Sequence, residues 1–387
     1  MKACCVGPLF NEKEYRAKAS SVWSRSLVAT ALVLSVLAGC SNSKSGPAAP
    51  PPVAPAPVAQ TYGAEPNPTG DAIGGGSGYR RMAAPGPARV TSPAELLNAL
   101  KNAKAGDTVY VDDKAELDLS GNQKVSIPGG VTLASGRGAG GSQGALIYST
   151  QLETFPLFVA GGPNVRVTGL RLRGPDTERR TQQMVQLHKE GKYYSIPNSR
   201  ALQCGQPGLE VDNCELWGWS HAALFLMPGA TRAHVHHNYI HHNQREGLGY
   251  GVCLDRAEAL IEANIFACCR HAIAGTGAPG TSYEACYNLV KPEDGNGHSF
   301  DMHGGKDRGD HTDTAGDWIR IHHNTFHATG VWAVVIRGRP TQKAEIHHNW
   351  FLHPDPNRTV LQSNATGNME IRDNRYGPAR QEIEPKR

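Results

Sequence analysis

Seven short segments of the chain share one pattern: an alternating apolar–polar strand, an asparagine, then a second apolar strand. Examples are "AHVHHNYIHH", "IRIHHNTFHA" and "AEIHHNWFLH". The asparagines are Asn213, Asn238, Asn264, Asn288, Asn324, Asn349 and Asn374, with spacings of 25, 26, 24, 36, 25 and 25 residues. An earlier segment, "VRVTGLRLRG", has Gly169 at the matching site. A constant period with β character and no helical signal predicts a solenoid of stacked coils.

The asparagine suits the corner of such a coil for two reasons. Asn tolerates left-handed backbone, and its side-chain amide can bond the same position of the next coil, which predicts an Asn ladder. These repeats resemble those of the pectate-lyase-like superfamily of right-handed parallel β-helices, over roughly residues 109–376. The resemblance implies an all-β, right-handed parallel β-helix. The paired-Asp calcium set and the Arg-containing signature of pectate lyases are missing, so the resemblance carries over no catalytic residue.

A helix is expected to plug the open N-terminal end of the solenoid, which otherwise presents unpaired strand edges. In "TSPAELLNALKNAKAGDTVYV", Ser92 is the expected N-cap, Pro93 takes the first helical position and Glu95 completes a capping box. The apolar stripe is Leu96, Leu97 and Leu100. Gly106 then ends the helix.

Residues 1–39 are predicted to be a lipoprotein signal peptide. Basic residues precede the apolar run "SLVATALVLSVLAGC", which is too short to span a bilayer. Its end, "LAGC", resembles the bacterial lipobox and implies lipidation of Cys40; the alternative is an ordinary cleaved signal with a chance cysteine. Ser41 rather than Asp follows, which favours a lipid anchor in the outer membrane.

The remainder divides into a tether and one domain. Residues 40–87 are rich in Pro, Ala and Gly and are expected to be a tether, so that residues 88–387 form the β-helix domain. A formal charge of +4 gives no reason to expect nucleic acid and allows an acidic glycan as partner. We expect a monomer. Six cysteines follow residue 200 and form either disulfides or buried thiols: Cys204, Cys214, Cys253, Cys268, Cys269 and Cys286.

The histidine-rich stretch "AHVHHNYIHHNQ" at first suggests a metal site. The His pair before Asn recurs at 236–237, 322–323 and 347–348, always at the predicted corner. In "IRIHHNTF", Ile319 and Ile321 should face the core while Arg320 and His322 face solvent. We therefore interpret these histidines as structural repeats and predict no metal among them.

In enzymes of the superfamily that these repeats resemble, substrates lie along the first sheet, so the resemblance implies chemistry on the first strand of each coil. Because coils stack about 4.8 Å apart, alternation places Asp255, Thr276, His303 and Arg337 in one outward column. Asp301 should stand beside His303 on the same face. His271 and His298 fall on the inward phase and are expected to be buried, hydrogen-bonded fillers.

Two insertions interrupt the coils near this column. One, "GGKDRGDHTDTAG", follows His303, and the other spans residues 174–208. Loops on a rigid scaffold concentrate function. We expect substrate-binding roles for Lys306, Arg308, Thr276 and Tyr250. The Asp-rich insertion offers oxygen ligands for Ca²⁺, although a solvated loop is the simpler interpretation.

These residues predict a polysaccharide lyase that cleaves an acidic, uronate-containing glycan by β-elimination. Arg337 would neutralise the uronate carboxylate and His303 would be the base, with Asp301 beside it. Uronate epimerisation would use the same set. Alternatives are a glycoside hydrolase that uses Asp255 and Asp301, and a glycan-binding surface lipoprotein without catalysis.

Overall fold

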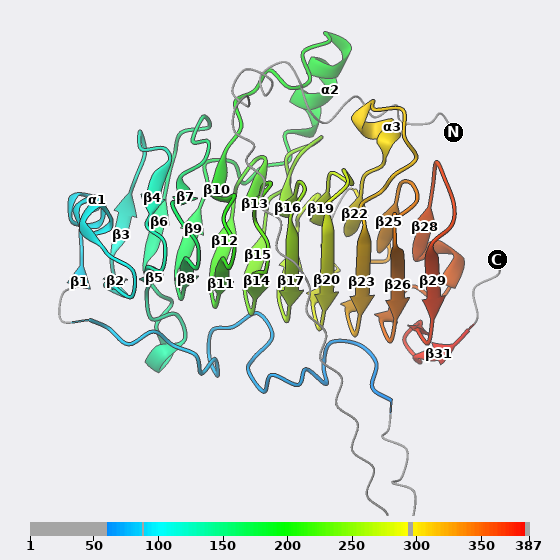
Figure 1. The fold of residues 1–387 in the computed structure, drawn as a ribbon, viewed down its shortest axis with the longest axis horizontal. Helices are drawn as coiled ribbons and strands as arrows, with labels where there is room; N and C mark the ends of the chain where they lie inside the picture. The colour runs from blue at the N-terminus through cyan, green and yellow to red at the C-terminus, as the bar shows by residue number, and fades with distance from the viewer. Residues whose placement is uncertain (1–59, 87–88, 293–296, 384–387) are drawn as a thin grey trace, which may run out of the picture. The chain divides into compact units, whose positions relative to one another are not determined.

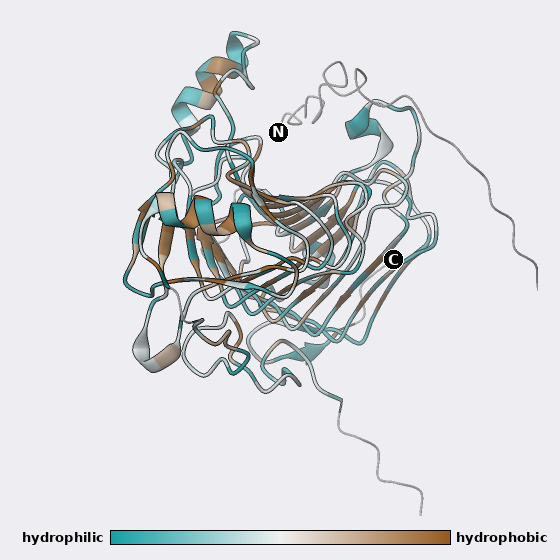
Figure 2. Cartoon of the chain, turned by 60° about the vertical axis from the view of Figure 1, so that its left-hand side comes forward, coloured by the Kyte–Doolittle hydropathy of each residue, from teal (hydrophilic) through white to brown (hydrophobic). Residues whose placement is uncertain are grey.

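The computed structural model describes residues 60–86, 89–292 and 297–383. Three long sheets of parallel strands form the domain, and successive strands of the chain enter the three sheets in turn (Figure 1). The prediction of a right-handed parallel β-helix is confirmed. In Figure 2 the apolar colouring follows the strands, and the loops at the corners are largely polar.

Nine strands form the sheet that carries the expected site: β4 (Val125–Ile127), β7 (Phe158–Ala160), β10 (Arg200–Cys204), β13 (Ala222–Leu226), β16 (Tyr250–Leu254), β19 (His271–Gly275), β22 (Phe300–Met302), β25 (Val334–Ile336) and β28 (Val360–Gln362).

Eleven strands form the sheet that precedes the asparagine corner: β1 (Arg89–Val90), β2 (Thr108–Val111), β5 (Thr132–Ala134), β8 (Arg166–Thr168), β11 (Glu210–Asp212), β14 (Ala233–His236), β17 (Glu258–Glu262), β20 (Ser282–Cys286), β23 (Trp318–His322), β26 (Lys343–His347) and β29 (Met369–Arg372).

Eleven strands form the sheet after that corner: β3 (Glu116–Asp118), β6 (Leu146–Tyr148), β9 (Arg171–Arg173), β12 (Glu215–Trp217), β15 (Tyr239–His241), β18 (Ile265–Ala267), β21 (Leu289–Val290), β24 (Thr325–Phe326), β27 (Trp350–Phe351), β30 (Arg375–Tyr376) and β31 (Gln381–Glu382). Only the last pair of this sheet, β30 with β31, is antiparallel.

The interior of the solenoid is filled by side chains that alternate inward along each strand. Ile319 and Ile321 of β23 are fully buried, as predicted, whereas Arg320 between them is exposed. Large rings also stack through the centre, with the rings of Phe326 and Phe351 5.0 Å apart. Each coil thereby covers the apolar face of its neighbours, which a single coil cannot do alone.

The asparagine ladder exists, but it begins one coil later than the sequence pattern suggested. Its six rungs are Asn238, Asn264, Asn288, Asn324, Asn349 and Asn374. The amide Nδ2 of Asn238 donates to Oδ1 of Asn264 (3.0 Å) and to the carbonyl of Val211 (2.8 Å). Cys214, not Asn213, occupies the preceding rung, where its backbone N–H donates to Asn238.

The left-handed residue of each corner also differs from the expectation. Asn213 has a φ of 53°, but in the ladder coils the residue before the asparagine takes this conformation, as at His237, His323 and His348. The asparagines therefore serve as hydrogen-bonding groups rather than as left-handed residues. The histidine pairs do lie at the corner, so their structural interpretation agrees with the structure.

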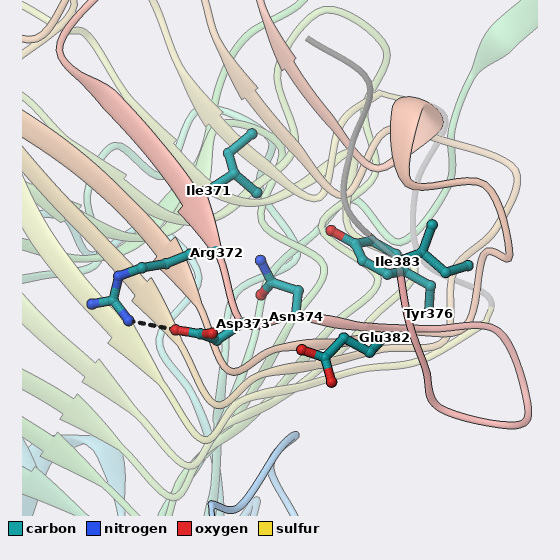
Figure 3. Close-up of a pocket in the computed structure, with 7 residues that line it drawn as sticks. All are labelled: Ile371, Arg372, Asp373, Asn374, Tyr376, Glu382 and Ile383. Atoms are coloured by element: carbon teal, nitrogen blue, oxygen red, sulfur yellow. Dashed lines mark hydrogen bonds and ion pairs between the residues drawn. The ribbon is translucent and has the colours of Figure 1, made fainter.

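The N-terminal end of the solenoid is covered by a helix. Helix α1 (Pro93–Asn102) packs against β2 and β4, with Ser92 as N-cap and with Leu96 and Leu100 buried. The Glu95 carboxylate accepts from the backbone of Thr91 rather than closing the expected capping box. At the C-terminal end, Ile371, Tyr376 and Ile383 help to line a pocket of about 10 Å³, which has room for about one water (Figure 3).

A segment that the sequence suggested was part of a tether is packed along the corner of the β-helix. We call residues 61–86 the strap; it is the blue stretch below the sheets in Figure 1. Its backbone donates from Gly63 to His348 and from Gly74 to Ala263, and the hydroxyl of Tyr79 donates to buried Asp212 (2.6 Å). The compact unit therefore begins at Thr61 and not at residue 88. The predicted signal peptide and Cys40 lie outside the described residues.

Of the two alternatives for the six cysteines, disulfides or buried thiols, the second holds for four of them. Cys204, Cys214, Cys253 and Cys286 are buried free thiols. Burial raises the pKa of the Cys214 thiol to about 12, so it is protonated at neutral pH. Within residues 60–86, 89–292 and 297–383, none of the helices has the length and apolar character of a bilayer span.

The corner histidines predict a loss of stability in mild acid. Burial lowers the pKa of His237, His323 and His347 to about 4, with neighbouring imidazoles adding to the effect. Between pH ~6.5 and ~4 the unfolded chain takes up protons that the folded chain refuses, so stability falls as pH falls, by at most about 1.4 kcal/mol per pH unit for each imidazole. Partial exposure of His323 and His347 reduces that figure.

Urea unfolding at pH 7.0, 5.5 and 4.5 measures this slope. His323→Asn is the matched variant, because Asn adopts the left-handed backbone of that position without an ionisable ring. The variant should show a shallower decline than the wild type. An unfolding free energy that is constant from pH 7.0 to 4.5 would contradict the prediction.

Candidate active site

The strand register brings the expected column together. Leu254, Gly275, Met302 and Ile336 are paired partners in β16, β19, β22 and β25. The residues that follow them are Asp255, Thr276, His303 and Arg337, which therefore stand one above another on the outer face, as alternation predicted. Asp301 is paired with Ala274 and Val335, one column away.

Asp301 is the centre of the cluster, and three side chains from three coils contact it. Arg337 donates from Nε to Oδ1 (2.9 Å) and from Nη2 to Oδ2. Nε2 of His303 lies 3.1 Å from Oδ2, and Nε2 of His271 lies 3.4 Å from the same oxygen. An acid, a guanidinium and two imidazoles thus share one small volume.

His271 is buried and hydrogen-bonded to the backbone of His298, as predicted, but its ring does not lie on the predicted inward phase. Ala272 and Ile273 both lie in the core although they are consecutive, and the same is true of Ala223 and Leu224. Alternation is therefore interrupted at the same position of these neighbouring strands, while the register between them is kept. The interruption turns His271 to the outer face, where its ring stacks on Tyr250 with centroids 5.6 Å apart.

The insertion after His303 folds back onto the column and shields it. Helix α3 (Gly305–Arg308) carries Asp307, whose Oδ2 accepts from the backbone of Gly304 and whose Oδ1 lies 3.4 Å from Nη1 of Arg337. Arg308 donates to the carbonyl of Thr276 (2.9 Å). In consequence the side chains of Asp301, His303 and Arg337 are 0%, 4% and 8% exposed, which corrects the expectation of a column open to solvent.

Helix α2 (Thr181–Lys189) stands on the other flank. In Figures 1 and 2, α2 and α3 rise beyond the nine-stranded sheet and are separated from one another. Arg245 at the base of this insertion is fully buried and forms an ion pair with Asp176. The two insertions therefore flank the outer face as loops on a rigid scaffold.

The four residues that were expected to bind substrate differ in their exposure and in their contacts. Lys306 alone is exposed. The Arg308 guanidinium donates to Asp310 and to the carbonyl of Thr276. The hydroxyl of Thr276 donates to Asp255 (3.0 Å). Tyr250 is buried, and burial raises the pKa of its phenol. Asp255 itself pairs with Thr276 and the exposed Arg256, away from the Asp301 cluster.

The carboxylates of the site are ionised. Burial alone would raise the pKa of Asp301, but its interactions with His303 and with the Arg337 guanidinium outweigh burial and hold that pKa well below its usual range. The pKa of Asp307 is likewise lowered, because His303 and Arg337 offset its burial. Burial together with Arg270 keeps the pKa of His271 well below 6.5, so its ring is neutral at pH 7.

Several buried nitrogen atoms of this cluster have no aligned hydrogen-bond partner among the described residues. They are both ring nitrogens of His303, Nε2 of His271, Nδ1 of His298 and Nη1 of Arg270. The 3.1 Å contact of His303 with Asp301 is close but poorly directed. Because buried polar groups are normally satisfied, so many in one place point to a polar ligand.

A metal ion is a poor candidate for that ligand. His271, Asp301 and His303 do place three ligand atoms within 4.8 Å of one another. However, Oδ2 of Asp301 already accepts from the Arg337 guanidinium, which would repel a divalent cation at the same oxygen. In the insertion, Asp307 accepts from the backbone of Gly304 and Asp310 accepts from the hydroxyl of Thr312, and Ca²⁺ binding by this loop stays a prediction.

Sequence reasoning missed three residues of the cluster: Arg270, His271 and, as a partner of His303, Asp307. Nδ1 of His303 lies 3.6 Å from Oδ2 of Asp307, an i,i+4 relation within the insertion. That spacing was readable in the sequence. The break in alternation that turns His271 to the outer face was not, because "RHAIAGT" has no residue signature for it.

Comparison with known proteins gives structural neighbours only. No protein-family model and no curated protein matches the chain. A family 28 exopolygalacturonase of Yersinia enterocolitica is 10% identical with a TM-score of 0.38, and the match covers 75% of each chain. The GH136 lacto-N-biosidase of Eubacterium ramulus is 12% identical with a TM-score of 0.37, over 70% of this chain and 49% of that one. Such a distant likeness does not assign an activity.

Proposed function

We propose that the protein is a polysaccharide lyase that acts on a uronate-containing glycan, with His303 as the general base. The observation that carries the proposal is the environment of that imidazole: it lies between two ionised carboxylates, Asp301 and Asp307, and the Arg337 guanidinium pairs with both of them. A carboxylate beside one ring nitrogen orients the imidazole and favours the protonated product of proton abstraction.

The reaction follows from these positions. Asp301 lies 3.1 Å from Nε2 of His303, and Asp307 lies 3.6 Å from Nδ1. Because α3 and its insertion bury His303, this insertion must move aside before a glycan reaches the imidazole. Nδ1 then removes the C5 proton of the uronate, the electron pair forms the C4–C5 double bond, and the C4–O4 bond breaks. The departing oxygen takes a proton from a general acid or water. A guanidinium on the uronate carboxylate stabilises the charge that develops after proton removal.

The same geometry disfavours glycoside hydrolysis. Hydrolysis needs a protonated carboxylic acid and a second carboxylate, about 5–5.5 Å or about 6.5–9.5 Å apart. Asp255 and Asp301 belong to coils two steps apart, which separates their backbones by about 10 Å along the stack alone. Asp301 and Asp307 both have lowered pKa values, so neither serves as the acid at neutral pH.

Incubation of the purified protein with alginate, pectate and glycosaminoglycans tests the proposal. A lyase generates an unsaturated uronate that absorbs at about 235 nm, because proton abstraction and elimination leave a conjugated acid. New reducing ends without that absorbance would indicate a hydrolase. Exchange of the C5 proton for solvent deuterium without cleavage would indicate an epimerase. Retention of glycan in an affinity gel with none of these would indicate a binding protein, and each of these three results would overturn the lyase assignment.

A further inference from the structure

We propose that Arg270 is the residue that binds the substrate carboxylate and that Arg337, which the sequence favoured for this role, is a positioning residue for Asp301. The inference rests on the proposed uronate chemistry and adds its specificity: the site takes the free acid of the uronate and not its ester.

Carboxylates of the protein already engage all three nitrogens of the Arg337 guanidinium. Its Nε and Nη2 both donate to Asp301, and its Nη1 lies 3.4 Å from Asp307. A substrate carboxylate at Arg337 would displace Asp301 and leave a fully buried carboxylate without its cation. Breaking a buried pair in this way is strongly unfavourable. The arrangement therefore makes Arg337 a fixed part of the protein that orients Asp301 toward His303.

Arg270 has the opposite character. Its backbone N–H donates to the carbonyls of Asn243 and Gly249, which fixes the start of β19. Nη1 of its side chain is buried and has no hydrogen-bond partner among the described residues. It forms no ion pair with a carboxylate of the described ranges, whereas Arg337 has two. A buried guanidinium nitrogen that still has a proton to donate is suited to an incoming carboxylate.

The charge of Arg270 acts on the same volume as the catalytic cluster. Burial lowers the pKa of His271 and His298 and the charge of Arg270 adds to this effect, whereas at Tyr194 the same charge opposes the burial that raises the pKa of the phenol; the guanidinium is therefore near residues of both β19 and the α2 insertion. His271 in turn contacts Asp301, and its ring centroid lies 6.4 Å from that of His303. A carboxylate held by Arg270 would lie beside the base, which is the geometry that C5 proton removal needs.

The experiment compares Arg270→Ala, Arg270→Lys and wild type on the uronate polymer that the first screen identifies, as the free acid and as its methyl ester. Arg270→Ala should lose about 100-fold or more of kcat/KM on the free acid, because a cation facing developing charge acts mainly in the transition state. Activity on the ester should change little, so the preference for the acid disappears. Ethylguanidinium at low millimolar concentration should restore part of the activity of Arg270→Ala but not of Arg337→Ala.

Two further measurements separate the possible outcomes. Arg256→Ala is the control, since Arg256 is an exposed arginine at the end of β16 and should leave kcat/KM unchanged. If the wild type shows no turnover, calorimetry of uronate oligosaccharide binding to the His303→Ala protein tests the inference instead. Acid-selective binding that Arg270→Ala removes supports the inference even if the wild type proves not to be a lyase. An unchanged acid preference in Arg270→Ala, in turnover or in binding, overturns it.

Discussion

His303→Ala should lose about 10³-fold or more in turnover of the uronate polymer, because general base catalysis contributes roughly 10²–10⁴-fold and no second imidazole occupies the same position. His271 cannot replace it. Its Nδ1 lies 2.6 Å from the carbonyl of His298, and its Nε2 faces Asp301 from the neighbouring coil. The loss should appear in kcat, since the removed proton transfer occurs only in the transition state.

The fold of the His303→Ala protein should be intact, because His303 makes no aligned hydrogen bond within the described part of the chain. Circular dichroism and the urea midpoint check this. His311→Ala is the matched control, an exposed histidine of the same insertion, and should keep wild-type activity. Full activity in His303→Ala would remove the proposed base and the site with it.

Asn288→Ala should lower the free energy of unfolding by about 3–5 kcal/mol, because it removes several buried hydrogen bonds at once and each unsatisfied group costs about 1–3 kcal/mol. The Oδ1 of Asn288 accepts from the backbone and the side chain of Asn264, at 2.9 and 3.0 Å. Its Nδ2 donates to the carbonyl of Ile261 and to Asn324, at 2.8 and 3.0 Å. Alanine leaves the buried N–H of Asn264 and the carbonyl of Ile261 without these partners.

Urea unfolding monitored by circular dichroism measures the effect. Asn102→Ala is the control, because Asn102 is exposed at the end of α1 and bonds only within that helix, so its change should stay within about 0.5 kcal/mol. A loss below about 1 kcal/mol in Asn288→Ala would show that water or a shifted neighbour replaces the ladder bonds.

The sequence predicted the coil, its register and most of the outer column, for one physical reason. Two periods act together: side chains alternate every two residues, and identical positions return after one coil. The position of Asp301 beside His303 follows from those periods alone. Any residue whose place depends only on counting along the strand was therefore predictable.

The failures have equally specific causes. Counting fails where a strand breaks its alternation, so His271 was assigned to the wrong face. It also fails where a corner residue resembles a ladder residue, so Asn213 was taken for a rung that Cys214 occupies. The strap was missed because its Gly-rich composition resembles a linker, while its contacts come from Tyr79 and backbone groups that composition does not reveal.

A stack in which every layer touches only the next can fray from either end, layer by layer. The strap changes this, because one continuous stretch of chain touches the layer of His348 near one end and that of Asp212 toward the other. Unfolding of the last coils therefore also disturbs the strap, which is bound to earlier coils as well. The unfolding of distant coils is thereby coupled. The domain should therefore unfold in a single cooperative transition rather than coil by coil from one end.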